Sequence, residues 1–215
     1  MMMIPMLKLA RNSVPLILAA VLLAAACQAS LAQGDADLEA PGLESFPAPA
    51  SNEPTAKLLA DNGIWWSLQP LLDDEDAPPL VNPVSQKKAL EVFAGTDNAY
   101  KLARKYNAKT ACGTDILFDA RLTTRQGAIL AKLVRWYTPA ETLKMATADN
   151  GELMALSGFI NPYPGRLGVV EEGAIADLLL VDGNPVENID LIADPDNNFL
   201  VIMTGGTIYK DTITK

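Results

Sequence analysis

The sequence predicts an α/β fold in which parallel strands alternate with helices and a small β unit ends the chain. Between residues 58 and 157, short apolar runs alternate with longer segments of helical periodicity. That order is typical of parallel strands joined by crossover helices. After Gly158 the helical periodicity stops, and "FLVIMTGGTIYK" places two apolar runs around Gly205 and Gly206. A glycine pair between such runs predicts a hairpin turn.

The first segment, residues 1–32, is typical of an export signal. Lys8 and Arg11 precede an apolar run of 13 residues, "VPLILAAVLLAAA", which suits a signal peptide and is short for a membrane-spanning helix. Small residues at Ser30 and Ala32 predict cleavage before residue 33. Cleavage at "AAAC" with a lipid on Cys27 is the alternative. We therefore expect an exported protein, periplasmic or secreted, whose membrane contact is limited to the signal or that lipid.

Composition narrows the possible functions further. The formal net charge is −9, and no Lys/Arg cluster is present. A nucleic-acid-binding protein needs a basic face to neutralise phosphates, so this class is not expected. Once the signal is removed, Cys112 is the one remaining cysteine, and no internal disulfide can form.

Residues 33–57 mix Pro, Ala, Gly, Ser and acids without an apolar period, which predicts a disordered linker. Order is expected from residue 58, with the end of a helix at 58–61 and a strand at 64–68. Asp73 to Asp76 then form an acidic loop. A calcium site there lacks the glycine and spaced glutamate of an EF-hand, so a solvated loop is favoured.

The next segments continue the alternation. Residues 85–107 carry helical spacing with a break expected near "AGTDN", and residues 109–116 form a strand that delivers Asp115 at its end. A helix follows at 126–137. "TPAE" is a capping box with proline at the first helical position, so another helix begins at Thr138 and ends near Ser157. In the tail, strands are expected at 167–170 and 176–181.

Several of these motifs together resemble the amidohydrolase superfamily of metal-dependent hydrolases. "GVVEEGAIADLLLVDGNPVENI" and "FLVIMTGGTIYK" resemble its C-terminal β-sandwich segment, and "CGTD" is similar to its eighth barrel strand. "TPAETLKMATADNGELMAL" is similar to the helical segment that follows. The resemblance runs through residues 58–215 in order. Within the superfamily, the sequence looks most similar to the imidazolonepropionase-like and dipeptidase-like branch.

The resemblance implies a fold and a chemistry. Residues 58–157 would be the last two β/α units of a (β/α)8 TIM barrel, and residues 158–215 a piece of a small β-sandwich. In the family the aspartate matching Asp115 binds a divalent metal, usually zinc, and exchanges protons with the metal-bound water that attacks a C–N bond. The expected substrate is a small-molecule amide, cyclic amide or dipeptide. Ser67 and Gln69, at the end of the preceding strand, are weak candidates for substrate contact, and half-buried strand termini without a ligand are the commoner explanation.

The chain also departs from the family pattern. It contains no histidine, although the family binds its metal through several. A single carboxylate cannot hold catalytic zinc, which needs about three protein ligands. We therefore expect an incomplete C-terminal portion of an enzyme, inactive alone. The alternative is a non-catalytic, exported or lipid-anchored binding or scaffold protein. Cys112 is expected to pack as a small apolar residue rather than to act as a nucleophile.

Overall fold

The structure, a computed structural model, describes residues 3–4, 53–77, 79–116 and 119–213. Apart from Met3 and Ile4, the expected export signal lies outside the described residues, as do Cys27 and most of the expected linker. Within the described ranges, no helix combines the length and the apolar character needed to cross a bilayer.

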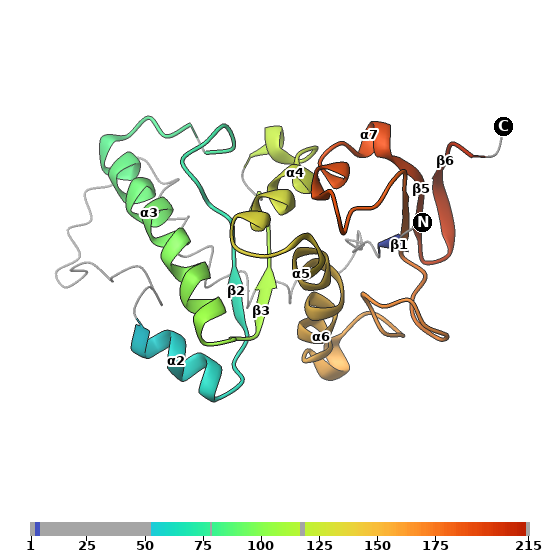
Figure 1. The fold of residues 1–215 in the computed structure, drawn as a ribbon, viewed down its shortest axis with the longest axis horizontal. Helices are drawn as coiled ribbons and strands as arrows, with labels where there is room; N and C mark the ends of the chain where they lie inside the picture. Colours follow the sequence, from blue (N-terminus) through green and yellow to red (C-terminus); the bar gives the residue numbers. More distant parts are fainter. Residues whose placement is uncertain (1–2, 5–52, 78, 117–118, 214–215) are drawn as a thin grey trace.

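Two separate sheets organise the molecule (Figure 1). Strands β2 and β3 pair in parallel, with Ser67 opposite Ala111, which confirms the parallel arrangement expected from the sequence. The second sheet has the order β1-β4-β5-β6, and all its neighbouring strands are antiparallel. The strands are β1 (Met3–Ile4), β2 (Trp66–Leu68), β3 (Thr110–Cys112), β4 (Leu178–Val181), β5 (Phe199–Thr204) and β6 (Thr207–Asp211).

Helix α2 spans Glu53–Asp61, so the last five residues of the expected linker, 53–57, are helical. The helix ends where the sequence predicts. The Asn62 side chain donates to the carbonyl of Leu58, and Gly63 takes a left-handed conformation with φ of 62°. The chain then turns directly into β2.

Helix α3 is one continuous helix, Pro83–Lys105, and the break expected near "AGTDN" is wrong. Asn82 caps it, with its side chain accepting from the amides of Val84 and Ser85. Inside the suspected break, the Thr96 hydroxyl donates to the carbonyl of Val92, four residues earlier, and Thr96 is buried. Tertiary packing of this segment therefore overrides its weak intrinsic helix propensity.

The helical region between the sheets is built from short pieces. The predicted capping box is confirmed: the Thr138 hydroxyl accepts from the amide of Glu141, whose carboxylate accepts from the amide of Thr138. The helical pieces are η1 (Ala120–Leu122), α4 (Gln126–Ala131), η2 (Lys132–Arg135), α5 (Pro139–Lys144), the π-helical η3 (Met145–Asp149), α6 (Asn150–Ala155) and η4 (Gly158–Ile160). The tail adds η5 (Ile189–Ile192) and α7 (Pro195–Asn198).

Residues 167–170 do not form the expected strand. Gly168 has φ of 76°, a left-handed conformation incompatible with an extended strand. A Cβ atom at this position would lie 2.1 Å from the carbonyl oxygen of Thr147. Gly168 thus lets the chain pack closely against the π-helical turn, and the second expected strand begins at Leu178 rather than Ala176.

The predicted C-terminal hairpin is confirmed. Gly205 and Gly206 have φ of 56° and 78°, the positive values that a two-residue hairpin turn requires. The buried carboxylate of Asp177 accepts a 2.6 Å hydrogen bond from the amide of Gly205. This bond fixes the hairpin turn next to the start of β4.

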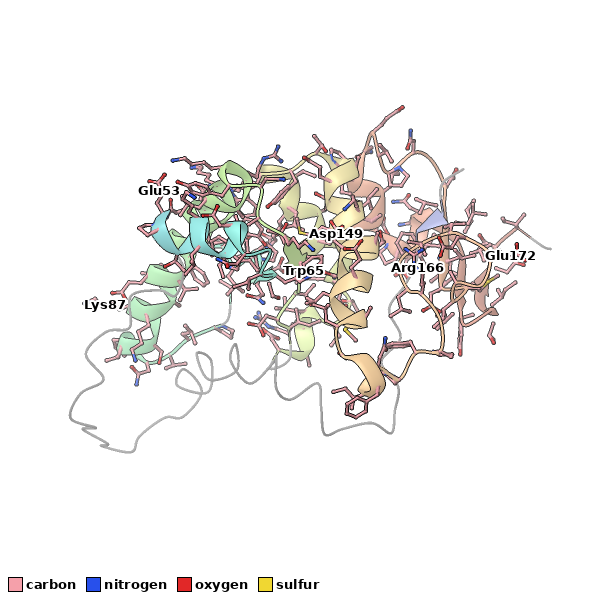
Figure 2. The ribbon with its side chains drawn as sticks, turned by 90° about the horizontal axis from the view of Figure 1, so that it is seen from below. Glu53, Trp65, Lys87, Asp149, Arg166 and Glu172 are labelled. Carbon is pink, nitrogen blue, oxygen red and sulfur yellow. The ribbon has the colours of Figure 1, made fainter. Side chains whose placement is uncertain are left out.

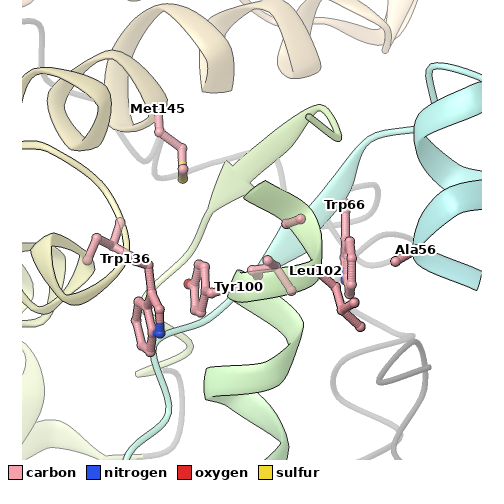
Figure 3. Packing of buried hydrophobic residues seen from close by; sticks show 9 residues of the cluster. Ala56, Trp66, Tyr100, Leu102, Trp136 and Met145 are labelled. Atoms are coloured by element: carbon pink, nitrogen blue, oxygen red, sulfur yellow. The ribbon is translucent and has the colours of Figure 1, made fainter. Parts of the chain in front are cut away.

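Two apolar clusters hold the described chain together. In the first, helices pack around the β2–β3 pair (Figure 3), and the rings of Tyr100 and Trp136 stack at 4.1 Å between centroids. The second joins Ala131 and Leu143 to the inner face of the four-stranded sheet at Leu179 and Val181. Partly buried Leu130 packs against both clusters, so it links the two sheets.

Replacing Leu133 with alanine should test the first cluster. Leu133 is fully buried, and truncating it leaves a cavity, so the free energy of unfolding should fall by about 2–5 kcal/mol. The neighbouring Val134, which is 41% exposed, is the matched control, and Val134→Ala should change stability by less than about 0.5 kcal/mol. Urea unfolding measures both. Equal effects of the two substitutions would contradict this core.

Candidate functional site

A cavity of about 300 Å³ lies where β2 and β3 end. Because the two strands are parallel, their carboxyl ends meet at one edge, and the loops that follow them face each other. Parallel α/β folds bind ligands at this edge. The cavity is lined by Pro70, Leu71, Leu72, Asp74, Asp76, Ala77, Pro79, Leu80, Phe93, Thr114, Asp115, Asp119, Arg121, Leu122, Ile129 and Lys132.

Asp115 lies in this cavity but not on a strand. Strand β3 ends at Cys112, so the expectation that the strand continues to residue 116 is wrong. Asp115 has φ of 51°, a left-handed conformation that few residues other than glycine adopt. Such conformations cost on the order of 1–3 kcal/mol and cluster at functional sites. This backbone turn sets the direction of the Asp115 carboxylate. The direction therefore does not follow the alternation of side chains along β3.

The carboxylate of Asp115 is half-buried and, within the described part of the chain, makes no ion pair. Burial raises its pKa above the ordinary value, because the charged form loses hydration without gaining a partner. Raised carboxyl pKa values favour proton transfer near neutral pH. Asp115 therefore has the properties of a candidate general base.

The acidic loop before α3 is not simply solvated, which corrects the sequence expectation. Lys132 contacts Asp74 and Asp76 at 2.7 Å each, and the Arg125 guanidinium also pairs with Asp76. The side chain of Asp76 is only 6% exposed. Burial opposes its ionisation, but the hydrogen bonds from Arg125 and Lys132 outweigh burial and lower its pKa. These pairs fix the loop as one wall of the cavity.

The other cation of the cavity is also paired within this part of the chain. Arg121 donates to both carboxylate oxygens of Asp119 through Nε, at 3.0 Å each. The hydrogen bond from Arg121 lowers the pKa of Asp119. The ion pair with Arg121 thus favours the ionised form of Asp119, whereas burial disfavours the ionised form of Asp115, four residues earlier.

Asn150 fixes the end of β3, a role that sequence reasoning missed. Its side-chain oxygen accepts from the amide of Cys112 at 3.1 Å, and its side-chain nitrogen donates to the carbonyl of Cys112 at 3.0 Å. Asn150 follows the π-helical turn, a geometry frequent at functional sites. The asparagine in "TADNG" was the available signal, since it belongs to the segment that resembles the family.

Cys112 itself fits the expected packing role. Burial is the main cause that raises the pKa of its thiol to about 11. The thiol therefore stays protonated at neutral pH and is a poor nucleophile.

The structure does not bring Ser67 and Gln69 to the cavity lining. Ser67 is exposed on β2, between buried Trp66 and Leu68. The side chain of Gln69 lies beside Gly113, 3.8 Å from the position that a Cβ atom would occupy there. Substrate contact by these two residues stays a prediction.

A second hollow, of about 360 Å³, lies at the opposite end of the β2–β3 pair. Figure 2 faces this end, with Trp65 and Asp149 near its centre. Here Lys109 lies over the Trp65 ring at 5.4 Å, and Arg104 pairs with Glu141 at 3.0 Å. The hollow is rich in such internal pairs, which is consistent with a stabilising role.

The described residues offer few ligands for a metal ion. Among the residues that the structure describes, no three His, Cys, Asp or Glu side chains group closely enough to hold one. The sequence contains no histidine, so no imidazole ligand can come from these 215 residues. Asp115 supplies one oxygen ligand where catalytic zinc takes about three protein ligands. The described residues alone therefore do not fit a catalytic metal.

Comparison with known proteins shows a similarity in fold to solved hydrolase structures. No family model and no curated protein matches the sequence. Among solved structures, a prolidase complexed with N-methylphosphonate-L-proline matches with 25% identity and a TM-score of 0.60, over 74% of this chain and 38% of its own. The described chain is therefore similar in fold to part of an amidohydrolase-superfamily structure. A solved amidohydrolase is 23% identical with a TM-score of 0.61, over 75% of this chain and 38% of its own.

A third solved structure that matches is the A. niger ochratoxinase, 24% identical with a TM-score of 0.60. It matches 77% of this chain and 36% of its own length. The present chain thus spans little more than a third of the length of these structures.

The substitution Asp115→Asn should stabilise the protein in a pH-dependent way. Because the folded pKa of Asp115 is raised, its contribution to stability is complete below the unfolded pKa and is lost as pH rises through the folded pKa. The asparagine variant avoids this loss. Its melting temperature should match the wild type near pH 3 and exceed it by roughly 2 °C at pH 7.

The control for this prediction is Asp119→Asn, whose pKa shift has the opposite sign. The stability that Asp119 contributes is present above its unfolded pKa and is lost as pH falls through the folded pKa. This variant should melt below the wild type at pH 7 and approach it near pH 3. Thermal scans at both pH values measure the pair, and parallel pH profiles of the two variants would contradict the assignment.

Removing the Asn150 side chain should loosen the end of β3. Asn150→Ala leaves the amide and carbonyl of Cys112 without these partners, so unfolding should become easier by about 1–3 kcal/mol. Asn184→Ala, which removes one exposed hydrogen bond to Val186, is the control and should have a much smaller effect. Urea unfolding gives the stabilities. The NMR pKa of Asp115 should also shift only in the Asn150 variant, and an unchanged pKa would contradict a positioning role.

Proposed function

We propose that this chain forms one side of the active site of a C–N bond hydrolase. It would contribute the proton-transferring carboxylate and the apolar wall of the substrate cavity. The observation that carries the proposal is Asp115, a half-buried carboxylate with a raised pKa at the carboxyl ends of two parallel strands, which makes no ion pair with the residues that the structure describes. The amidohydrolase and prolidase folds of the neighbouring structures support a hydrolase.

The finer architecture is part of the same proposal. The unit from β2 to α6 would correspond to the last two β/α units of a TIM barrel, with Asp115 after the eighth strand. The tail from residue 158 would be one piece of a small β-sandwich. The adjacent apolar runs of β4 and β5 support this, because strands apolar on both faces are typical of sheets covered on both sides. The imidazolonepropionase-like and dipeptidase-like branch remains the proposed relationship.

The proposed chemistry starts from the carboxylate. Asp115 would accept a proton from the attacking water and return it to the leaving nitrogen, the two transfers that hydrolysis of an amide requires. Zinc is the cofactor that the family resemblance implies, and it would activate that water. Because the described residues do not fit zinc, we expect no turnover from these 215 residues alone. The proposed substrates are small amides, cyclic amides or dipeptides.

A second candidate is a non-catalytic binding or scaffold protein that has kept the fold. The absence of histidine and the single carboxylate at the metal position favour it. In both proposals the protein is exported to the periplasm or the exterior, by signal cleavage after Ala32 or with a lipid on Cys27.

A graft into the solved prolidase tests the hydrolase proposal. Residues 53–213 would replace the structurally matching segment of that protein, which contributes the rest of its own active site. The graft should hydrolyse a dipeptide ending in proline, and Asp115→Asn should lower its kcat at least about 100-fold. Asp119→Asn in the same graft should stay within about threefold.

Two outcomes separate the candidates. A graft that folds, as shown by circular dichroism, but hydrolyses nothing would favour the binding or scaffold protein. For the isolated chain, metal analysis after equilibration with zinc should give well below one zinc per chain. One tightly bound zinc that is lost in Asp115→Ala would instead show a complete metal centre.

A further inference from the structure

We propose that Asn62 is a site of spontaneous covalent modification, at which the side-chain amide is lost as ammonia and the backbone is rearranged. This site is separate from the cavity at Asp115 and does not depend on the proposed hydrolysis. The tetrapeptide "ADNG" occurs twice in the chain, at residues 60–63 and at residues 148–151. Because the two copies have the same local chemistry, a difference in their reactivity has to come from the fold.

The reaction needs an asparagine followed by glycine, and water as the co-reactant. The backbone nitrogen of Gly63 attacks Cγ of Asn62, and an N–Cγ bond forms. The side-chain nitrogen departs as ammonia, and the proton of the Gly63 amide passes through solvent to this leaving group. A five-membered succinimide ring remains, and water opens it at either carbonyl to give aspartate or isoaspartate. Glycine has no Cβ to obstruct the attack.

The fold leaves the first copy open to this reaction. Asn62 and Gly63 are exposed where α2 ends and the chain turns into β2 (Figure 1), and a Cβ on Gly63 would meet no atom within 4 Å. The Asn62 side chain donates to the carbonyl of Leu58 at 2.9 Å, and the Gly63 amide donates to the carbonyl of Ala60 at 3.1 Å. Both hydrogen bonds belong to the last turn of a helix, and helix ends fray.

The fold closes the second copy. Asn150 and Gly151 are the first residues of α6, which continues directly from the π-helical η3. The Asn150 side chain is fixed on β3 by the amide and the carbonyl of Cys112. A Cβ on Gly151 would lie 2.4 Å from the carbonyl oxygen of Leu167, so the backbone is closely packed there. Ring formation at Asn150 therefore requires these contacts to open first.

The modification would weaken the junction between α2 and β2. It places a carboxylate beside Asp61 at the carboxyl end of α2, where the helix dipole disfavours negative charge. The new carboxylate cannot donate to the carbonyl of Leu58, and isoaspartate also lengthens the main chain by one carbon atom. Helix α2 packs on the first apolar cluster through the fully buried Ala56. We therefore expect the modified chain to unfold at a lower urea concentration.

Peptide mapping by mass spectrometry tests the proposal on the full chain, incubated at pH 8 and 37 °C. Peptides that contain Asn62 should show the mass change from NH2 to OH at least about tenfold faster than peptides that contain Asn150, because hydrogen bonds to Cys112 must break at the second copy. Isoaspartate should be detected at position 62. Asn62→Gln disfavours the five-membered ring, so it should abolish the change at position 62 and leave position 150 as in the wild type.

The same incubation of the chain unfolded in guanidinium chloride is the matched control. Without the fold, the two copies of "ADNG" should react within about threefold of each other. Equal rates in the folded chain would overturn the proposal, as would aspartate without isoaspartate at position 62, since ring opening gives both. A preference for Asn62 of the same size in the unfolded chain would also overturn it, because the local sequence would then account for the difference.

Discussion

The parallel pairing of β2 with β3 is the constraint on which the rest of the structure depends. It is a short ladder of three residues on each strand, but it sets the direction in which both following loops leave the sheet. Antiparallel pairing would send the acidic loop and Asp115 to opposite ends. The crossover helix α3 makes the parallel arrangement possible, and its buried Tyr100, stacked on Trp136, connects the strand pair to the helices beyond it.

The cavity combines two kinds of carboxylate whose environments push their pKa values apart. Asp76 and Asp119 lie beside guanidinium or ammonium groups that stabilise the ionised form. Asp115 is half-buried without such a neighbour among the described residues, and its ionised form is disfavoured. Separation of pKa values among neighbouring acids is a common feature of sites that divide structural and chemical roles. In the described part of the cavity, the paired acids build the wall, and Asp115 is the acid to which we assign the proposed proton transfer.

The sequence predicted the features that depend on local chemistry. The capping box at Thr138 and the glycine pair of the hairpin require particular residues at particular positions, and both were found. The failures came from tertiary contacts. The segment around Thr96 stays helical although its propensity is weak, since Thr96 is buried, and Gly168 leaves extended geometry because it packs on a π-helical turn.

The same distinction applies to the candidate site. The motif was enough to single out Asp115. It did not predict the left-handed backbone of this residue, nor that its carboxylate makes no ion pair with the residues that the structure describes. The pairing of Lys132 with Asp74 and Asp76, and the contact of Asn150 with Cys112, join residues far apart in sequence. No pattern within a single segment encodes such contacts.

The ion pairs of the acidic loop have a consequence for the order of folding. Lys132 reaches Asp74 across 58 positions of sequence, and Arg125 reaches Asp76 across 49. Closing chain segments of this length loses more entropy than forming a helix or a hairpin turn. We therefore expect α3 and the C-terminal hairpin to form early and the loop to close late. The cavity would then be among the last parts of the molecule to take shape, and among the first to open when the chain is locally destabilised.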